Sequence, residues 1–349
     1  MLNEMTEMTN NFLLSRRKAL QLIAGMTGGM VLHSLKSPVA RSDSMTKMSL
    51  GGVTWIGLTP FFIAREKGFF AENNLDVNLQ IFSANTDYIA AFLAGRIDGS
   101  ISTVTSEAVL MADKGKDYKI IMIQDISAGG DGILARNSVA SVADFKGKQV
   151  AVERGAVGHF FLLQILEEAG LSEQDITIVN ADGATATAAY QAGNVDIAYS
   201  YAPFLAQANK AQPDGRTIYD SSQMPTAITD FYILDSEYIE ANPEAAEAFI
   251  AGIVKALNFL ETDRDEALAI AAAKLEVTPE ELSKDLEGIK IINVETNVEM
   301  LTDSNSDIYI LNSINAMGEF LVSQGQIQTV PDMAQFIEPK FIQSVQAAQ

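Results

Sequence analysis

The chain has 349 residues, with 24 Lys plus Arg against 45 Asp plus Glu and a net charge of −21. This length predicts two domains, because single hydrophobic cores seldom grow beyond about 250–300 residues. The negative charge argues against binding to nucleic acids or anionic membranes, and the absence of cysteine excludes disulfides, thiolate metal sites and cysteine nucleophiles.

The first forty residues predict an export signal. A basic stretch, Ser15-Arg16-Arg17-Lys18, precedes a weakly apolar segment at 19–35, and the small residue Ala40 follows. The segment is too short and too polar for a membrane span of about 20 apolar residues, so we expect a cleaved signal peptide at 1–40 and a soluble periplasmic protein. Residues 1–40 hold four bases and two acids, so their removal changes the net charge from −21 to −23.

The paired arginines resemble a twin-arginine export signal. The match to the pattern Ser-Arg-Arg-x-Phe-Leu-Lys is incomplete, since Ala19 stands at the Phe position and Gln21 at the Lys position. A Sec signal with a chance arginine pair is the alternative. Neither route adds a lipid anchor, because the chain has no cysteine to modify.

From Met48 onward, short apolar runs alternate with amphipathic stretches. This pattern predicts strands at 53–57, 75–82, 99–104 and 119–124, and helices at 60–68, 86–94 and 106–114. Strands and helices in alternation, joined by short turns, are typical of parallel βαβ units.

The pattern then starts again and predicts a second α/β unit. Its strands are expected at 132–135, 149–152, 176–179 and 196–200, and its helices at 142–145, 158–169, 184–192 and 203–212. A further strand at 231–234 and helices at 243–262, 264–275, 279–288 and 308–323 follow. No linker is rich enough in Pro or Gly to separate independent domains, so we expect two packed units that share chain crossings at 125–131 and 223–229.

One run of residues resembles a known family. Residues 55–70 are similar to the opening of SsuA-like solute-binding proteins of ABC importers for sulfonates, nitrate, taurine and thiamine pyrimidines. They read Trp-Ile-Gly-Leu-Thr-Pro-Phe-Phe-Ile-Ala-Arg-Glu-Lys-Gly-Phe-Phe. Further matches follow in order, at 75–77, 94–98, 144–152, 196–203 and 238–244, so the resemblance covers about 48–345. The ordered series is specific for the family and says little about the substrate.

The resemblance implies a fold class and a mode of action. The fold would be α/β, a bilobal type 2 periplasmic binding protein with two lobes joined by a hinge of two crossings. Lobe one would hold 48–128 and 226–349, and lobe two 129–225. The lobes would close over a small-molecule ligand, and the closed monomer would deliver it to a membrane permease and its ATPase.

Candidate ligand-binding residues follow from the rule that ligands of open α/β sheets meet the loops after the strands. Hydroxyl groups and the backbone N–H groups at helix starts would hold polar parts of the ligand, and aromatic rings would form its walls. Tyr199 and Tyr201 both lie at the end of the strand predicted at 196–200, and only one of them need face the ligand. The candidates are Trp55, Thr59, Asn85, Thr86, Thr103, Thr105, Ser106, Ser127, Arg154, Gly155, Ala156, His159, Tyr199 and Tyr201.

Each candidate also has a structural interpretation. The hydroxyls at 102–106 are typical helix caps, Trp55 could belong to the core, and His159 could be a buried structural histidine. Arg154 could pair with the neighbouring Glu153 instead of a ligand acid.

The charge of the ligand stays open between two alternatives. Arg154 is the one strong base in the candidate loops, whereas five acids lie near them: Glu107, Asp131, Glu153, Asp182 and Asp230. We slightly favour a sulfonate-like organic anion. If two or more of these acids point inward, the ligand would instead carry an amine or a pyrimidine ring, whose N–H groups carboxylates accept.

Two other functions compete with transport. An enzymatic branch of the same fold makes the thiamine pyrimidine, and resemblance to it implies a cysteine-rich motif and a reactive histidine. This chain has no cysteine and only His33 and His159, so we expect no enzyme, no metal and no cofactor. A periplasmic sensor that uses the same lobes remains the second alternative.

Overall fold

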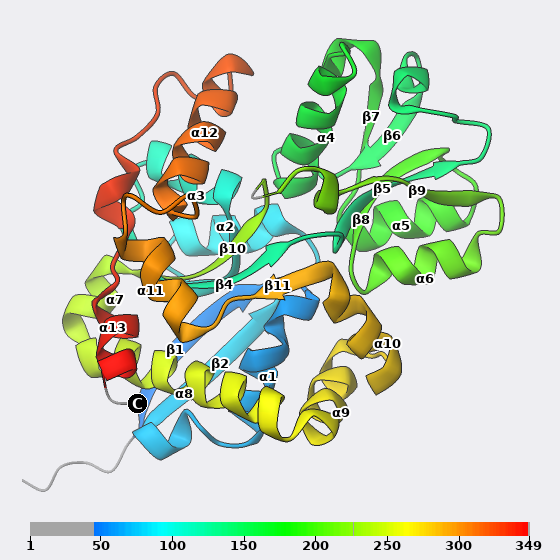
Figure 1. Cartoon of the computed structure of the whole chain (residues 1–349). Helices are drawn as coiled ribbons and strands as arrows, with labels where there is room; N and C mark the ends of the chain where they lie inside the picture. Colours follow the sequence, from blue (N-terminus) through cyan, green and yellow to red (C-terminus); the bar gives the residue numbers. More distant parts are fainter. Residues whose placement is uncertain (1–44, 226, 348–349) are drawn as a thin grey trace, which may run out of the picture. The chain divides into compact units, whose positions relative to one another are not determined.

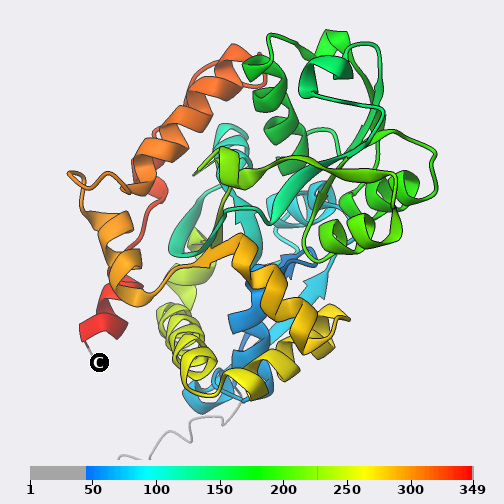
Figure 2. The same cartoon turned by 45° about the vertical axis from the view of Figure 1, so that its right-hand side comes forward.

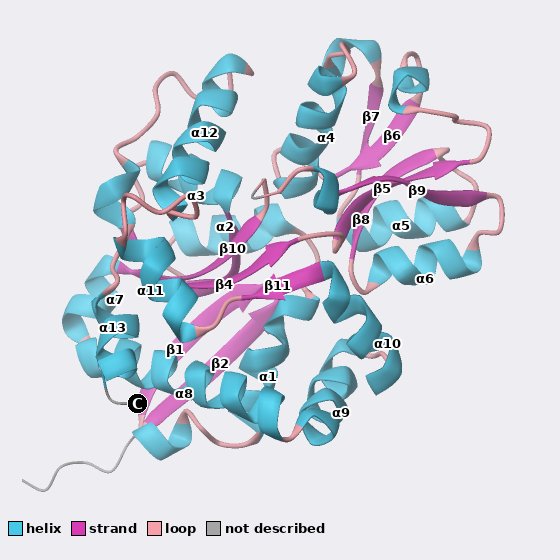
Figure 3. Cartoon of the chain, in the orientation of Figure 1, coloured by secondary structure: helices cyan, strands magenta, loops and turns pink. Residues whose placement is uncertain are grey.

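Two mixed β-sheets organise the chain. The computed structural model describes residues 45–225 and 227–347, and all of these fall in one compact unit. The predicted signal peptide at 1–40 lies outside the described residues. None of the described helices is long and apolar enough to cross a bilayer. Figure 3 shows the strands of the two sheets as separate groups.

The larger sheet has six strands in the order β11-β4-β10-β3-β1-β2. Strands β1, β2 and β3 run parallel, while β10 is antiparallel to both β3 and β4, and β11 is antiparallel to β4. Their bounds are β1 Thr46–Gly52, β2 Leu75–Ile81, β3 Gly99–Val104, β4 Tyr118–Ser127, β10 Thr229–Asp235 and β11 Ile289–Ile291.

Helices α1, α8 and α9 pack together beside this sheet (Figures 1 and 2). The ring of Phe70 stacks on that of Phe249 in α8, with centroids 5.3 Å apart, and burial of such rings stabilises the fold. The helices associated with the six-stranded sheet are α1 Thr59–Glu66, α2 Asn85–Leu93, α3 Thr105–Asp113, α7 Ser236–Ala241, α8 Pro243–Thr262, α9 Arg264–Leu275, α10 Pro279–Asp285, α11 Val294–Thr302, α12 Ile310–Ser323 and α13 Lys340–Ala347.

The smaller sheet has five strands in the order β7-β6-β8-β5-β9. Strand β6 is parallel to β7 and β8, whereas β5 is antiparallel to β8 and β9. Helix α4 covers one face, and α5 and α6 cover the other (Figure 1). The bounds are β5 Asp131–Arg136, β6 Gln149–Val152, β7 Thr177–Asn180, β8 Ile197–Tyr201, β9 Gly215–Asp220, α4 Val157–Glu168, α5 Gly183–Gln191 and α6 Phe204–Ala211.

The chain passes between the two sheets twice, from β4 to β5 and from β9 to β10. The two crossings are tied by a hydrogen bond of 2.7 Å between the buried hydroxyls of Ser127 and Ser221. The N–H of Gly129 also donates to the Ser221 hydroxyl, at 2.7 Å. This is the α/β, bilobal type 2 arrangement expected from the sequence, and we call the six-stranded sheet with its helices the first lobe and the five-stranded sheet with its helices the second lobe. The lobe boundaries at 128 and 226 stay predictions.

The predicted elements agree with the structure in most places and fail in three. Strands at 99–104 and 149–152 are confirmed to the residue, but the strand predicted at 53–57 is wrong, since β1 ends at Gly52 and residues 56–58 form a 3-10 helix. The expected parallel pairing is confirmed among β1, β2 and β3 and among β6, β7 and β8. It fails for β10 and β5, which run antiparallel to their neighbours. Elements β9, β11, α7, α11 and α13 were not predicted.

Candidate functional site

A cavity of about 330 Å³ lies where strand ends from both sheets meet. The first lobe supplies the residues after β1, the start of α2, the end of β3 and the start of β10, and the second lobe supplies the start of β5, the start of α4 and the end of β8. The lining consists of Val53, Trp55, Asn85, Ser102, Val104, Asp131, Val157, Tyr199, Tyr201, Ile228 and Asp230.

Three aromatic rings form one wall. Tyr201 lies edge-on to Trp55 with ring centroids 6.1 Å apart, and Tyr199 lies 5.9 Å from Tyr201. Both tyrosines line the cavity, because residues two apart on a strand share a face. Gly158 permits this packing, since a Cβ there would lie 2.2 Å from Cδ1 of Tyr199.

Trp55 is held in place by a buried carboxylate. Its indole Nε1 donates to both oxygens of Asp125, at 3.3 and 3.2 Å. Gly57 leaves room for this contact, because a Cβ at that position would lie 1.9 Å from Oδ2 of Asp125. Burial raises the pKa of Asp125, while the Trp55 hydrogen bond opposes the rise and the charge of Asp131 adds to it.

Two acids line the cavity itself. Asp131 is 3% exposed and Asp230 is 4% exposed, and Oδ2 of each is buried without a hydrogen-bond partner. The Tyr199 hydroxyl donates to Oδ1 of Asp131. Burial raises the pKa of Asp131 to about 6, against hydrogen bonds from Ser127 and Tyr199. Burial and the charges of Asp125 and Asp131 raise the pKa of Asp230 well above its ordinary value.

A further buried acid lies in the first lobe, beside the end of β3. Glu107 is fully buried in α3 and accepts hydrogen bonds from the Tyr88 hydroxyl and, at 3.3 Å, from the N–H of Val104. Burial raises the pKa of Glu107 to about 8, with these hydrogen bonds opposing the rise. Among the described residues, no group of three or more acids and histidines is arranged to hold a metal ion.

Glu153 connects the two lobes. It follows β6 in the second lobe, and its carboxylate accepts hydrogen bonds at the start of α2 in the first lobe. The N–H of Asn85 donates to Oε2 at 3.0 Å, and the N–H and hydroxyl of Thr86 each donate to Oε1 at 2.8 Å. A carboxylate is a favourable partner for a helix N-terminus, so this end of α2 is already occupied by an anionic group of the protein.

Several predicted hydroxyl candidates are buried away from the lining. The Thr59 hydroxyl donates to the carbonyl of Ile56 at 2.7 Å. The hydroxyl of Thr105 donates to the carbonyl of Thr229 at 3.4 Å. Thr103, Ser106 and Ser127 are also buried and do not belong to the residues that line the cavity.

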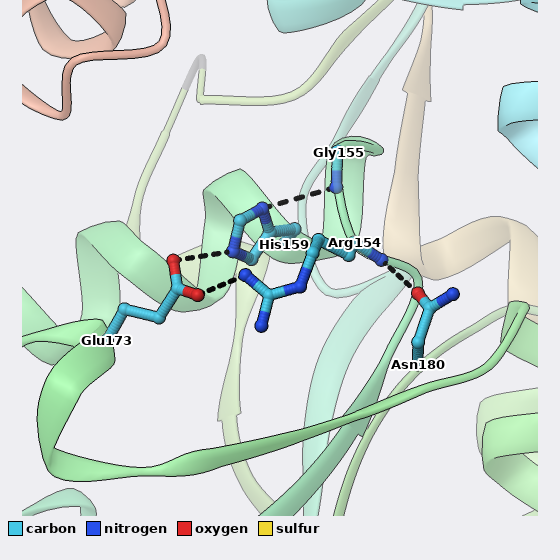
Figure 4. Close-up of polar contacts among 5 residues, drawn as sticks. All are labelled: Arg154, Gly155, His159, Glu173 and Asn180. Carbon is cyan, nitrogen blue, oxygen red and sulfur yellow. Dashed lines mark hydrogen bonds and ion pairs between the residues drawn. The ribbon is translucent and has the colours of Figure 1, made fainter.

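The predicted candidates at the start of α4 form a cluster of their own (Figure 4). The guanidinium of Arg154 pairs with Glu173, and Nε2 of the buried His159 lies 3.2 Å from the same carboxylate. The N–H of Gly155 donates to Nδ1 of His159 at 3.2 Å. Burial lowers the pKa of His159, and Glu173 opposes this. Arg154, Gly155, His159 and the adjacent, buried Ala156 are absent from the cavity lining.

The structure thus places Trp55, Asn85, Tyr199 and Tyr201 in the lining, and Thr86 next to it through Glu153. Ser102 also lines the cavity and belongs to the group of hydroxyls at 102–106 noted in the sequence. The sequence candidates omitted Val53, Val104, Asp131, Val157, Ile228 and Asp230. Asp131 and Asp230 were noted only as acids near the candidate loops, and the four apolar residues carry no signal that distinguishes them from core residues.

Comparisons with known proteins agree with this architecture. A family model described as NMT1/THI5 like matches residues 55–267. The taurine-binding periplasmic protein of Escherichia coli is 24% identical over 301 residues, which cover 81% of this chain and 89% of that protein. The alkanesulfonate-binding protein SsuA from Xanthomonas axonopodis pv. citri, solved bound to MOPS, matches with a TM-score of 0.67 and 19% identity over 84% of this chain and 98% of that one.

An enzyme shares the fold as well. The desulfurization enzyme DSZB matches with a TM-score of 0.62 and 15% identity, over 86% of this chain and 99% of that one. The fold alone therefore does not separate a binding protein from an enzyme.

Proposed function

Because the chain belongs to the NMT1/THI5-like family, we propose that it is the periplasmic solute-binding protein of an ABC importer. The observation that carries the proposal is the cavity, which both lobes line at their strand ends and which the two chain crossings flank. A relative named as a periplasmic binding protein supports it. The chain would act as a monomer after removal of residues 1–40.

In the proposed mechanism, a ligand enters the cavity while the lobes are apart and is enclosed when they close. A ligand shifts this equilibrium only as far as it binds the closed state more tightly than the open one. The contacts between Glu153 and the start of α2 exist only when the lobes are together, so they add to the stability of the closed state. The permease would then recognise the closed form.

The ligand class is the finer part of the proposal. The names of relatives favour the sulfonate-like anion expected from the sequence. The lining favours the alternative, a ligand with a nitrogen group, because it holds two acids and no Lys, Arg or His. By the criterion that two or more acids point inward, the nitrogen-bearing ligand is the better supported of the two.

Thermal shift of the purified full chain tests the solute-binding proposal. The panel contains taurine, alkanesulfonates, nitrate, bicarbonate, aromatic acids, pyrimidines and alkylamines. A ligand present at 100 times its Kd stabilises the folded chain by about 2.7 kcal/mol, which is a shift of several degrees in Tm. A shift with one class supports the proposal, and no shift with any class contradicts it.

Transport is distinguished from sensing in cells. Deletion of the gene should abolish uptake of the ligand identified in the panel, and uptake that continues unchanged in the deletion strain would favour the periplasmic sensor.

A further inference from the structure

We infer that the cavity takes a small organic cation, whose protonated nitrogen lies between Asp131 and Asp230. This inference rests on the proposed function and narrows it to one chemical class of ligand: a protonated amine or amidine on a small apolar body.

The first observation is the state of the two carboxylates. They come from different lobes, both line the same cavity, and each is at least nine-tenths buried. Oδ2 of each lacks a hydrogen-bond partner. A buried carboxylate oxygen without a partner is costly, so these two positions define where a ligand with N–H donors would be stabilised.

The second observation is the charge around the cavity. Asp230 on β10 stands opposite Asp125 on β4 in the sheet register, and Glu107 in α3 lies close enough for its charge to act on Asp230. None of the residues that line the cavity is basic. Burial raises the pKa values of both Asp131 and Asp230, and the charges of neighbouring acids, Asp131 among them, raise the pKa of Asp230 further, as expected for acids that lack a cationic partner. A bound cation would supply that partner, whereas an anion would add a further negative charge.

The third observation is that the groups suited to an anion are used elsewhere. The N-terminus of α2, which could hold a sulfonate, instead binds the carboxylate of Glu153. Arg154, the base expected to meet a ligand acid, pairs with Glu173 (Figure 4). An anionic ligand that used either of these two groups would therefore have to displace an existing ion pair or existing hydrogen bonds.

The remaining lining sets the body of the ligand. The rings of Trp55, Tyr199 and Tyr201 can stabilise a cation through their faces, and Val53, Val104, Val157 and Ile228 complete an apolar enclosure. Because these side chains surround the cavity closely, it fits a compact molecule rather than an extended polyamine.

Isothermal titration calorimetry on the purified full chain at pH 8 tests this inference. The probes are butylammonium, benzylammonium and benzamidinium, with butanol and benzyl alcohol as neutral counterparts and butanesulfonate, taurine and Zn²⁺ as competitors. We expect at least one cation to bind and its neutral counterpart to bind at least tenfold more weakly. This comparison needs no variant, so it does not depend on the folding of a mutant.

Two variants locate the site. We expect Asp131→Asn and Asp230→Asn each to weaken cation binding at least tenfold. Asp182→Asn is the matched control, because Asp182 caps α5 outside the lining and Asn preserves the cap. It should change the Kd by less than threefold.

The outcomes separate the inference from the proposed function. Binding of butanesulfonate without any cation would overturn the inference and leave the proposed function standing. Binding of taurine alone would overturn the claim that the ligand is a cation. Binding of Zn²⁺ alone would overturn the claim that the ligand is an organic molecule. If neither this set nor the wider panel contains a ligand, both the inference and the proposed function are contradicted.

Discussion

The replacement Glu153→Gln tests how the closed state is stabilised. The carboxylate of Glu153 joins the second lobe to the start of α2 through the N–H groups of Asn85 and Thr86 and the Thr86 hydroxyl. Gln keeps the size of the side chain and one oxygen. Its amide NH₂ would face a backbone N–H group, so that side of the contact changes from attraction to a donor–donor clash.

The magnitude follows from the bonds that are lost. Hydrogen bonds to a charged group contribute roughly 1.5–3 kcal/mol each, and a negative charge at a helix N-terminus contributes about 0.3–1 kcal/mol more. With one oxygen retained, we expect the closed state to lose about 2–4 kcal/mol. Since 1.4 kcal/mol is a factor of about ten, the Kd of the ligand should rise roughly 30-fold or more, provided that the free protein is mostly open.

The assay combines calorimetry with small-angle X-ray scattering, using whichever ligand the panel identifies. Saturating ligand should reduce the radius of gyration of the wild-type chain, and Glu153→Gln should need at least 30-fold more ligand for the same change. Glu173→Gln is the matched control, because its carboxylate contacts Arg154 and His159 within the second lobe (Figure 4), and its Kd should stay within twofold of wild type. A wild-type Kd and scattering profile for Glu153→Gln would refute the reasoning.

Three further predictions concern the cavity. Trp55 is the only tryptophan and lines the cavity, so its fluorescence should change as ligand is added, and the Kd from that titration should equal the Kd from calorimetry. A fluorescence spectrum that stays constant at saturating ligand would contradict the placement of Trp55. Gly158→Ala places a Cβ 2.2 Å from the Tyr199 ring and should destabilise the chain by about 1–3 kcal/mol in urea unfolding, whereas unchanged stability would show that the ring can move freely. In the ligand-free chain, Asp131 has a pKa raised from 3.8 to about 6, so the folded state binds a proton that the unfolded state releases. The free energy of unfolding should therefore rise by about 3 kcal/mol from this group as pH falls from about 7 to about 4. The Tm should be higher at pH 6 than at pH 8, and Asp131→Asn should reduce the difference; a Tm that falls over this interval would contradict the sign.

Local patterns in the sequence were sufficient to predict much of the fold. Strands such as 99–104 and 149–152 are short apolar runs between clear turn residues, and both are found where predicted. The strand predicted at 53–57 was wrong because Gly51 and Gly52 resemble a turn, while in the structure they lie inside β1, where a Cβ on Gly51 would meet Ile97 at 2.5 Å. A close approach of this kind depends on tertiary packing and leaves no local signal.

Strand direction was harder to predict than strand position. Strand β10 lies between β3 and β4 in the sheet, although both of those strands precede it by more than 100 residues in the chain. It runs antiparallel to both. Alternation of strands and helices predicts parallel neighbours, and it contains no information about a strand that returns after the second lobe is complete.

The candidate site was predicted in part for a similar reason. Trp55 and Tyr201 stand out by residue type and lie in the cavity, whereas Val157 and Ile228 resemble any core residue. Arg154 was the natural partner for an anion, yet it pairs with Glu173, which lies 19 residues away in sequence. The net charge that the cavity presents to a ligand depends on which charged side chains pair with one another. Only the structure shows these pairings, so only the structure could favour one ligand class.

The most direct test of the account is to identify the ligand that the protein itself retains. The full chain would be purified from cells grown in rich medium and then denatured. The small molecules that it releases would be quantified by mass spectrometry. The account predicts a nitrogen-containing organic cation in near-stoichiometric amount, reduced in the Asp131→Asn variant. A sulfonate, nitrate or other anion at that stoichiometry, retained equally by the variant, would contradict it.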